Sequence, residues 1–401
     1  MMKLIQFLIA VCFSFACLHP LVAAAQDVNL PVAFNVKIAG DDATTRFFLD
    51  FDKNLSIRTF YIDQPYRIII DLDEAAFSFD EDAQPVTRGL IKAVQFGRIS
   101  SGRSRIVLTL AGPAEIIKAS MQKRLDQDYF RFLIDMDSTD EETFAKLLDS
   151  QGTSLGQSAR SALKGDRVRK PEKVDGQFTV VLDPGHGGID GGASGRGGAK
   201  EKDIVLSFAN KLANRIRQLG PYNVLLTRDD DVFVSLKERL EFSRSAQADL
   251  FISIHADSLS QRAVRGATIY TLSKKASDRL SERLAEAENR VDLVAGLTLE
   301  SDAEAVNDIL ADLTARETKT FSRSFSNILV GHLQEEIFLI KNPQRSAAFG
   351  VLKAPDVPGV LLELGYLSNK EDEVLMQQES WQEKVADAVG LAVDGFFKLR
   401  K

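Results

Sequence analysis

The stretch Thr179–Ala193, TVVLDPGHGGIDGGA, decides the fold of the second half of this 401-residue chain. A short apolar run opens it, and a glycine-rich loop that carries His186 follows at once. In open α/β sheets, ligands bind in the crevice outside the carboxyl ends of the strands. The glycines allow close approach of the backbone around the histidine. The stretch therefore predicts a buried strand that presents an imidazole at the edge of a sheet.

Strands and helices alternate on the carboxyl side of this stretch. Apolar residues recur every four positions in the next segment until Gly220, which predicts a helix that ends there. The apolar runs Leu250–Ile254 and Gly359–Leu362 predict buried strands. Residues 177–401 are therefore predicted to form an α/β domain on a mostly parallel sheet.

The amino-terminal half has a different pattern. Residues 26–137 alternate seven short runs rich in β-branched and aromatic residues with turn residues, which favours an all-β antiparallel sandwich. This half contains no histidine or cysteine, so we expect no catalytic cluster in it. Residues 138–176 begin with acidic, helix-like sequence and continue with residues rich in Gly, Ser and charge, and we predict a flexible or partly helical linker.

The first 25 residues have the organisation of a secretory signal peptide. Lys3 precedes a long apolar run, and Ala23–Ala25 supplies the small residues of a cleavage site. The alternative is a membrane anchor, which Pro20 and the small-residue site disfavour. Both cysteines lie in this segment, so the mature chain would form no disulfide. An exported chain of this kind fits a bacterial periplasm best.

The composition limits the partners of the protein. Its 50 basic and 57 acidic residues give a formal net charge of −7, which offers no electrostatic footprint for nucleic acid. The length suits two domains with connections. We therefore expect two domains and no binding to nucleic acid. We also expect a monomer.

Three potential metal ligands stand at the ends of predicted elements. His186 and His255 each come at the end of a strand, and Glu201 opens the helix after the glycine-rich loop. Two imidazoles and one carboxylate form a three-ligand Zn²⁺ set that leaves a position for water, as catalytic zinc sites do. A lone histidine is more often a satisfied or solvated side chain, but the combination of strand ends and glycines favours a Zn²⁺ site.

Glu363 is the predicted general base. It ends the apolar strand of VPGVLLELGYLSN, and a carboxylate buried there indicates pairing, metal contact or catalysis. In catalysis it would take a proton from the attacking water and pass it to the leaving amine. The structural alternative is a salt bridge to an arginine such as Arg196.

From Phe178 to its carboxyl terminus the chain resembles the family-three N-acetylmuramoyl-L-alanine amidases. Their DPGHGG, helix-borne Glu, SIHAD and E-x-x-Y-LSN stretches all occur here in that order. The resemblance implies Zn²⁺ binding by His186, Glu201 and His255, with Glu363 as the catalytic glutamate. It also implies that the substrate is peptidoglycan, cut between N-acetylmuramic acid and L-alanine. The amino-terminal sandwich resembles the AMIN domain of cell-division amidases, which implies a role in daughter-cell separation.

Residues 273–325 form an insertion that a minimal α/β domain does not need. They have helical periodicity, and from periodicity alone they are a solvated surface hairpin. However, AEAENRVDLVAG resembles the ENxxDLxGG stretch of division amidases, in which a helix covers the zinc cleft. The resemblance implies that Glu288 occupies the open metal position and holds the enzyme inactive. Ala295 stands where the family commonly has glycine.

A partner would have to displace this helix. The resemblance implies a division-associated activator related to inactive zinc endopeptidases. A second predicted helix offers such a partner an apolar face that includes Val306, Ile309, Leu310 and Leu313.

Two other functions remain open from the site residues. A zinc endopeptidase of cell-wall peptides would use the same chemistry, since zinc and a glutamate base serve any amide. A non-catalytic peptidoglycan-binding scaffold would keep the fold without the reaction. The complete ligand set together with Glu363 weighs against the scaffold, and product analysis separates the two hydrolases. The sequence leaves open whether the sandwich binds glycan or protein.

Overall fold

The computed structural model describes residues 30–79, 86–100, 102–125, 127–151, 174, 176–295, 297 and 309–400. The predicted signal peptide lies outside these residues, and so does most of the predicted linker. Within the described ranges, no helix is long and apolar enough to cross a membrane.

The amino-terminal region is built from two packed sheets. One has the strand order β5-β1-β2-β9-β8 and the other β3-β4-β7-β6, with only β1 and β5 running parallel. Apolar residues from both sheets share one core, as in a sandwich. The predicted all-β sandwich is thus confirmed. The strands are β1 (Val32–Gly40), β2 (Thr44–Phe51), β3 (Ile57–Ile62), β4 (Arg67–Asp73), β5 (Ala76–Phe77), β6 (Ile91–Ser100), β7 (Arg103–Leu110), β8 (Ala114–Lys123) and β9 (Phe130–Ser138).

Two of these strands, β5 and β8, lie outside the seven predicted runs, which span residues 32–40, 45–52, 57–63, 66–73, 91–99, 105–112 and 128–137. β5 is only two residues long. β8 lies at the edge of its sheet and, among the described strands, pairs only with β9; its sequence AEIIKASMQK has mostly half-exposed or exposed side chains. An edge strand has less to bury, so its sequence lacks the strong apolar alternation of a central strand.

Helix α1 (Glu141–Ser150) follows the last strand of the sandwich. Asp140 begins it, because its side chain accepts a hydrogen bond from the Thr143 N–H at 2.7 Å. Its buried Phe144 packs edge-on against Tyr61 and Tyr66. The first part of the predicted linker segment is therefore a helix attached to the sandwich.

The carboxyl-terminal region contains a six-stranded sheet of order β11-β10-β12-β15-β13-β14. All neighbouring pairs are parallel except β13 and β15. This confirms the predicted α/β fold on a mostly parallel sheet. The strands are β10 (Thr179–Pro184), β11 (Asn223–Leu226), β12 (Leu250–His255), β13 (Ala267–Leu272), β14 (Leu339–Ala347) and β15 (Gly359–Glu363).

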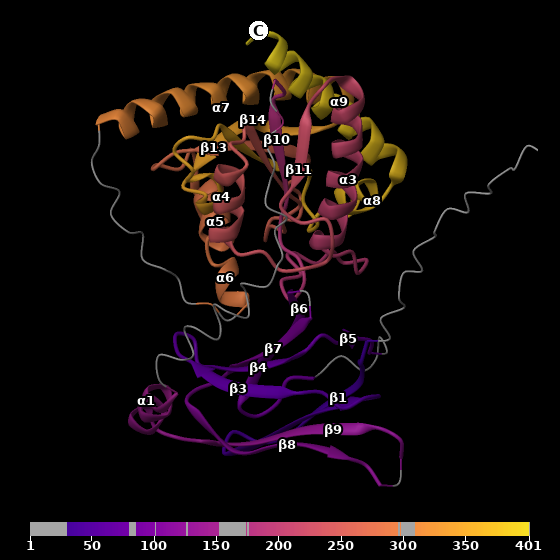
Figure 1. Ribbon diagram of the computed structural model, residues 1–401, viewed down its shortest axis with the longest axis vertical. Helices are drawn as coiled ribbons and strands as arrows, with labels where there is room; N and C mark the ends of the chain where they lie inside the picture. The colour runs from indigo at the N-terminus through magenta and orange to yellow at the C-terminus, as the bar shows by residue number, and fades with distance from the viewer. Residues whose placement is uncertain are drawn as a thin grey trace, which may run out of the picture. The chain divides into compact units, whose positions relative to one another are not determined.

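Helices cover both faces of this sheet (Figure 1). In β10, Val180 and Leu182 belong to the core under α3, α7 and α9, and Val181 belongs to the core under α4 and α5. Burial on both faces explains the continuous apolar runs in the sequence. The helices are α3 (Glu201–Leu219), α4 (Leu236–Ser245), α5 (Arg279–Glu288), α6 (Val291–Val294), α7 (Ile309–Glu336), α8 (Lys370–Met376) and α9 (Glu379–Lys398), with a 3₁₀ turn at Gly350–Leu352.

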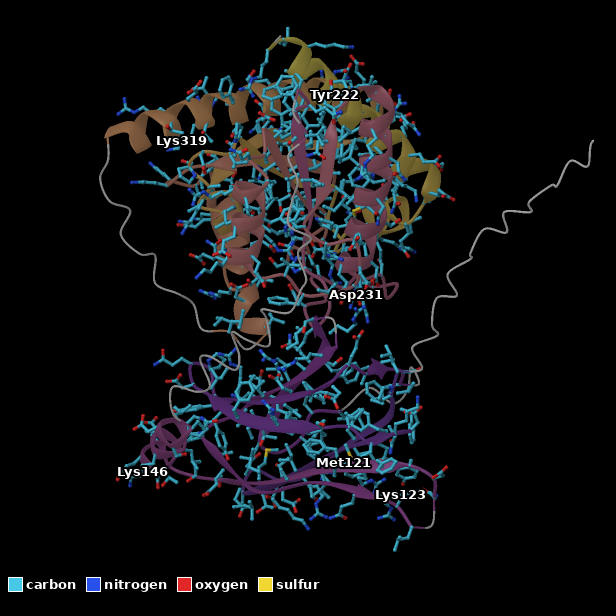
Figure 2. All side chains as sticks on the ribbon, in the orientation of Figure 1. Met121, Lys123, Lys146, Tyr222, Asp231 and Lys319 are labelled. Carbon is cyan, nitrogen blue, oxygen red and sulfur yellow. The ribbon has the colours of Figure 1, made fainter. Side chains whose placement is uncertain are left out.

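Helix α7 differs from the sequence prediction. From Ile309 onward, the second predicted insertion helix and the sequence that follows it through Phe325 form one continuous helix of 28 residues. No Gly or Pro stands between these two parts, so nothing interrupts the backbone hydrogen bonds between them. Phe325, Leu329 and Leu333 bury one side of α7, whereas Lys319, labelled in Figure 2, is exposed. The apolar face predicted at 306–313 lies outside the described side chains.

Candidate metal centre

The ends of two parallel strands bring the predicted histidines together. His255 ends β12 and His186 follows β10. These strands are neighbours, and beyond them the Gly185 N–H donates to the Ile254 carbonyl at 2.9 Å. The centroids of the two imidazole rings are 5.1 Å apart. A Cβ on Gly185 would lie 2.5 Å from the His255 ring, so only glycine fits between them.

Glu201 places a carboxylate against both imidazoles. It is the first residue of α3, and its oxygens lie 3.2 Å from His186 Nε2 and 3.2 Å from His255 Nδ1. Each oxygen also accepts a backbone N–H at 2.8 Å, one from Ala193 and the other from Ala256. These bonds fix the carboxylate without a cation. The structure therefore brings the three predicted metal ligands to one place.

Glu288 joins this group from the other side. It ends α5, and its oxygens lie 3.8 Å from His186 Nε2 and 3.3 Å from His255 Nδ1. Ligand atoms of His186, His255 and Glu288 all lie within 4.8 Å of one another. Glu288 is 8% exposed, so it lies inside the centre rather than on the surface.

The hydrogen-bonding of the two imidazoles fits a metal ion. His186 Nε2 and His255 Nδ1 are both buried, and neither has a hydrogen-bond partner of good geometry in the part of the chain that the structure describes. Buried polar atoms without partners are costly and rare. Two nitrogens that converge with two carboxylates form an N and O ligand set that suits Zn²⁺.

The charges of the centre lead to the same conclusion. Burial opposes protonation of His186, but the surrounding carboxylates, Asp190 first, outweigh burial and raise its pKa well above the usual value. Burial also opposes protonation of His255, and Glu288 is the largest of the groups that raise its pKa. The two imidazoles in turn hold the Glu201 pKa well below its usual value against the effect of burial. The centre thus favours positive charge, which a divalent cation would supply.

Glu363 lies beside this group at the end of the adjacent strand. It pairs with His255 across β12 and β15 and is completely buried. Its Oε2 accepts the Asp257 N–H at 3.0 Å, whereas its Oε1 has no partner among the described residues. Burial, with a further contribution from the Asp257 carboxylate, raises the Glu363 pKa well above the usual value. The alternative salt bridge to Arg196 is not formed, and Arg196 is exposed.

Sequence reasoning missed Asp190. Its Oδ2 lies 2.6 Å from Nδ1 of His186, and both side chains are buried. The residue is part of the same glycine-rich stretch, so the IDGG sequence was the available signal. Its significance depends on how the loop folds, which the sequence pattern does not show.

A second buried network holds the backbone of the histidine loop. Arg239 of α4 donates to Asp183 at 2.6 Å and to the His186 carbonyl at 2.8 Å. Asp183 also accepts the hydroxyls of Thr227 and Ser253, at 2.6 and 2.7 Å. Burial raises the Asp183 pKa, but Arg239 and the hydroxyls outweigh it and lower the pKa. The carboxylate is therefore ionised and pairs with Arg239.

The segment that carries Glu288 is anchored to the α/β body at two further residues. The Asn289 side chain donates to the Ala348 carbonyl at 2.9 Å and accepts the Gly350 N–H at 2.5 Å. Asp292 accepts the N–H of Leu236, the first residue of α4, at 3.0 Å. Helix α5 is thus packed onto the body and does not form a fully solvated hairpin.

Two family models match the chain. The model for N-acetylmuramoyl-L-alanine amidases matches residues 180–394, and the AMIN domain model matches residues 35–134.

Individual amidases are also similar to this chain. The N-acetylmuramoyl-L-alanine amidase AmiC of Neisseria meningitidis serogroup B is 30% identical over 93% of this chain and 92% of its own length. The N-acetylmuramoyl-L-alanine amidase AmiA of Escherichia coli K12 is 38% identical over 58% of this chain and 81% of its own length. Among solved structures, the N-acetylmuramoyl-L-alanine amidase AmiC2 of Nostoc punctiforme matches 56% of this chain and 99% of its own, with 27% identity and a TM-score of 0.42.

Proposed function

The chain belongs to the N-acetylmuramoyl-L-alanine amidase family and acts on peptidoglycan, and we propose that it does so with Zn²⁺ held by His186, Glu201 and His255. The observation that carries this proposal is the pair of buried imidazole nitrogens that lack hydrogen-bond partners of good geometry and converge on carboxylates. We assign the cut to the amide between N-acetylmuramic acid and L-alanine.

Glu363 is the proposed general base. Zn²⁺, when bound, polarises the scissile carbonyl and makes water a stronger nucleophile at neutral pH. The Asp257 N–H holds Oε2 of Glu363, which leaves Oε1 to take a proton from the attacking water. A raised pKa lets the carboxyl group keep that proton until the L-alanine nitrogen leaves and accepts it. The Glu363 proton therefore ends on the amine product, and the carboxylate is regenerated.

Glu288 is the proposed inhibitor of the free enzyme. Its carboxylate lies between the imidazoles, in the position where water would have to enter. A carboxylate there excludes the nucleophile, so hydrolysis requires that α5 moves away. We propose that a division-associated activator protein, resembling an inactive zinc endopeptidase, binds the displaced state and shifts the population toward it.

The remaining features give the proposed setting of this reaction. Residues 1–25 act as a signal peptide and direct a monomer to the periplasm. Residues 26–137 are the AMIN domain, 138–176 the linker and 177–401 the catalytic domain, with 273–325 as its regulatory insertion. The AMIN domain would concentrate the enzyme on peptidoglycan where daughter cells separate.

Digestion of purified sacculi tests these assignments together. The mature protein and its Glu288→Ala variant are compared with and without a chelator and added Zn²⁺, and soluble products are identified by mass spectrometry. We expect intact stem peptides that begin with L-alanine, no release under chelation, and faster release by Glu288→Ala. Fragments cut inside the stem would contradict the amidase assignment, activity in chelator would contradict the Zn²⁺ assignment, and an unchanged variant would contradict autoinhibition.

A further inference from the structure

We propose that Asp190 is a positioning residue, which fixes the ring orientation and tautomer of His186 so that Nε2 faces the metal centre. The inference rests on the proposed metal site. It starts from the 2.6 Å contact between Asp190 Oδ2 and His186 Nδ1, in which both side chains are buried.

A carboxylate at that distance accepts a hydrogen bond from the imidazole. The proton of a neutral His186 therefore lies on Nδ1, and the lone pair lies on Nε2. This is the nitrogen that lies 3.2 Å from Glu201 and 3.8 Å from Glu288. Histidine ligands are commonly oriented in this way by a carboxylate on the other ring nitrogen, which also makes them stronger ligands.

The two histidines of the centre are thus held differently. His255 presents Nδ1 to the carboxylates of the centre, so its ring is turned the other way round. His186 presents Nε2 and uses Nδ1 for Asp190. Among the contacts of the described residues, only the arrangement of His186 includes a carboxylate outside the ligand set, that of Asp190.

The loop itself fixes Asp190 in place. Asp190 and Gly187 exchange two backbone hydrogen bonds, at 2.8 and 3.1 Å, which closes the loop between them. Asp190 Oδ1 accepts the Gly192 N–H at 3.1 Å. His186 has a φ of +57°, a left-handed conformation that is unfavourable for a non-glycine residue. Asp190 is not the only side chain that stabilises this conformation, because Arg239 donates a hydrogen bond to the His186 carbonyl at 2.8 Å.

Arg239 holds the backbone of His186 and Asp190 holds its ring, so loss of Asp190 should affect the ring alone. Because Arg239 keeps the backbone of His186 in place, an Asp190 variant retains the loop and loses control of the ring. We expect the affinity for Zn²⁺ to fall while the fold persists. The test therefore has to measure metal affinity and the protonation of His186, and activity alone does not suffice.

The experiment compares Asp190→Ala, Asp190→Asn and the parent by Zn²⁺ competition with a chromophoric chelator. The matched control is Asp203→Asn, which changes an exposed carboxylate in the first turn of α3. We expect Asp190→Ala to weaken Zn²⁺ binding about 10- to 100-fold and the control to bind as the parent does. Asp190→Asn keeps an oxygen that can accept from Nδ1, so its loss should be smaller.

A spectroscopic measurement separates positioning from a general structural role. The chain has four histidines, which makes ¹H–¹⁵N spectra of labelled, zinc-loaded protein assignable. We expect an Nδ1 proton on His186 that exchanges slowly in the parent and is lost in Asp190→Ala, with unchanged circular dichroism. Parent-like Zn²⁺ affinity and a retained Nδ1 proton in that variant would overturn the proposal while the metal site stands. A parent that binds no Zn²⁺ would overturn the metal site itself.

Discussion

Glu201 and Glu363 are both fully buried, but their pKa values are shifted in opposite directions. Glu201 faces two imidazoles, which outweigh burial and stabilise its charge. Desolvation of Glu363, together with the nearby carboxylate of Asp257, raises its pKa. The same residue type thus supplies a permanent anion for a cation and a group that can hold a proton.

Because the proposed base and the proposed ligands are different residues, hydrolysis and Zn²⁺ binding should be lost in different variants. Glu363→Gln should retain Zn²⁺ and lose hydrolysis by about 10²- to 10⁴-fold, because the proton acceptor is removed and the ligands stay. His255→Ala should lose Zn²⁺, because only two of the proposed ligands remain. Metal content of the purified variants and product release from sacculi measure the two effects.

The exposed Glu379→Gln on α9 is the control, and it should match the parent in both measurements. Full hydrolysis by Glu363→Gln would place the base elsewhere. Parent-like Zn²⁺ content in His255→Ala would remove that residue from the ligand set.

The sequence pattern identified the candidate site residues at the ends of strands. It did not identify the residues that hold those side chains and their backbone in place. His186, His255 and Glu363 could be found because polar residues at the ends of apolar runs are visible in one dimension. Asp190 and Arg239 could not, because their contacts depend on the left-handed backbone at His186 and on where α4 lies. Neither feature has a signature in composition or periodicity.

At the scale of elements, α5, α6 and the residue between them contact the α/β body at more places than Glu288. Asn289 bonds to the backbone at both Ala348 and Gly350. Asp292 bonds to the N–H at the start of α4, where the helix dipole also favours a negative charge. These contacts are independent of any metal, so they can be altered without touching the centre.

Asn289→Ala should raise basal hydrolysis. Loss of two hydrogen bonds of about 1 kcal/mol each weakens the closed state by about 2 kcal/mol, and the open population should rise up to about 30-fold. Activity on sacculi without activator measures this. Arg290→Ala changes the adjacent exposed side chain and should leave basal activity as it is. An equal response of both variants would show that Asn289 does not hold the segment closed.

Asp292 predicts a pH dependence of closure. Burial raises its pKa from 3.8 to about 6, against the effects of the Leu236 N–H and Arg239. The closed state therefore binds a proton more readily than an open, solvated segment. As pH rises from about 4 to about 6, the closed state loses stability, by at most about 3 kcal/mol for a shift of this size.

Asp292→Asn removes that buried charge and keeps an oxygen for the Leu236 N–H. We expect lower basal activity than the parent at pH 8 and a difference that shrinks toward pH 5. The ratio of the two activities at each pH is the measurement, since it cancels titration within the centre. A ratio that does not change with pH would contradict this role of Asp292.

Sequence patterns predicted elements well where burial is strong. The central strands β10, β12 and β15 are buried on both faces and appeared as apolar runs. The edge strand β8 and the undivided α7 were missed, because one buries little and the other has no local marker of continuity.

At the scale of the whole molecule, each of the two regions has a core of its own. The described core of the sandwich contains only residues between Ala33 and Met136. The cores on the two faces of the α/β sheet contain only residues after Phe178 or at that position. Each region therefore has a large core that its own residues complete, which is the physical requirement for independent folding.

Residues 31–151 should consequently fold alone, with α1 included because Phe144 packs on the sandwich. A cooperative thermal transition and a β-rich circular dichroism spectrum of this fragment are the expected results. Residues 177–401 should still hydrolyse sacculi once Glu288 is replaced by alanine. A fragment without a cooperative transition, or a catalytic fragment without activity, would show that one region depends on the other.

Gly185 lies so close to the His255 ring that a Cβ there would meet it at 2.5 Å. The main chain that leads into the two histidines is therefore spaced by the distance between neighbouring strands, about 4.8 Å in any sheet. Side chains around the centre can change without altering this backbone spacing, because hydrogen bonds between the strands set it. Substitutions around the centre can thus change substrate preference while the backbone spacing at the two histidines stays constant.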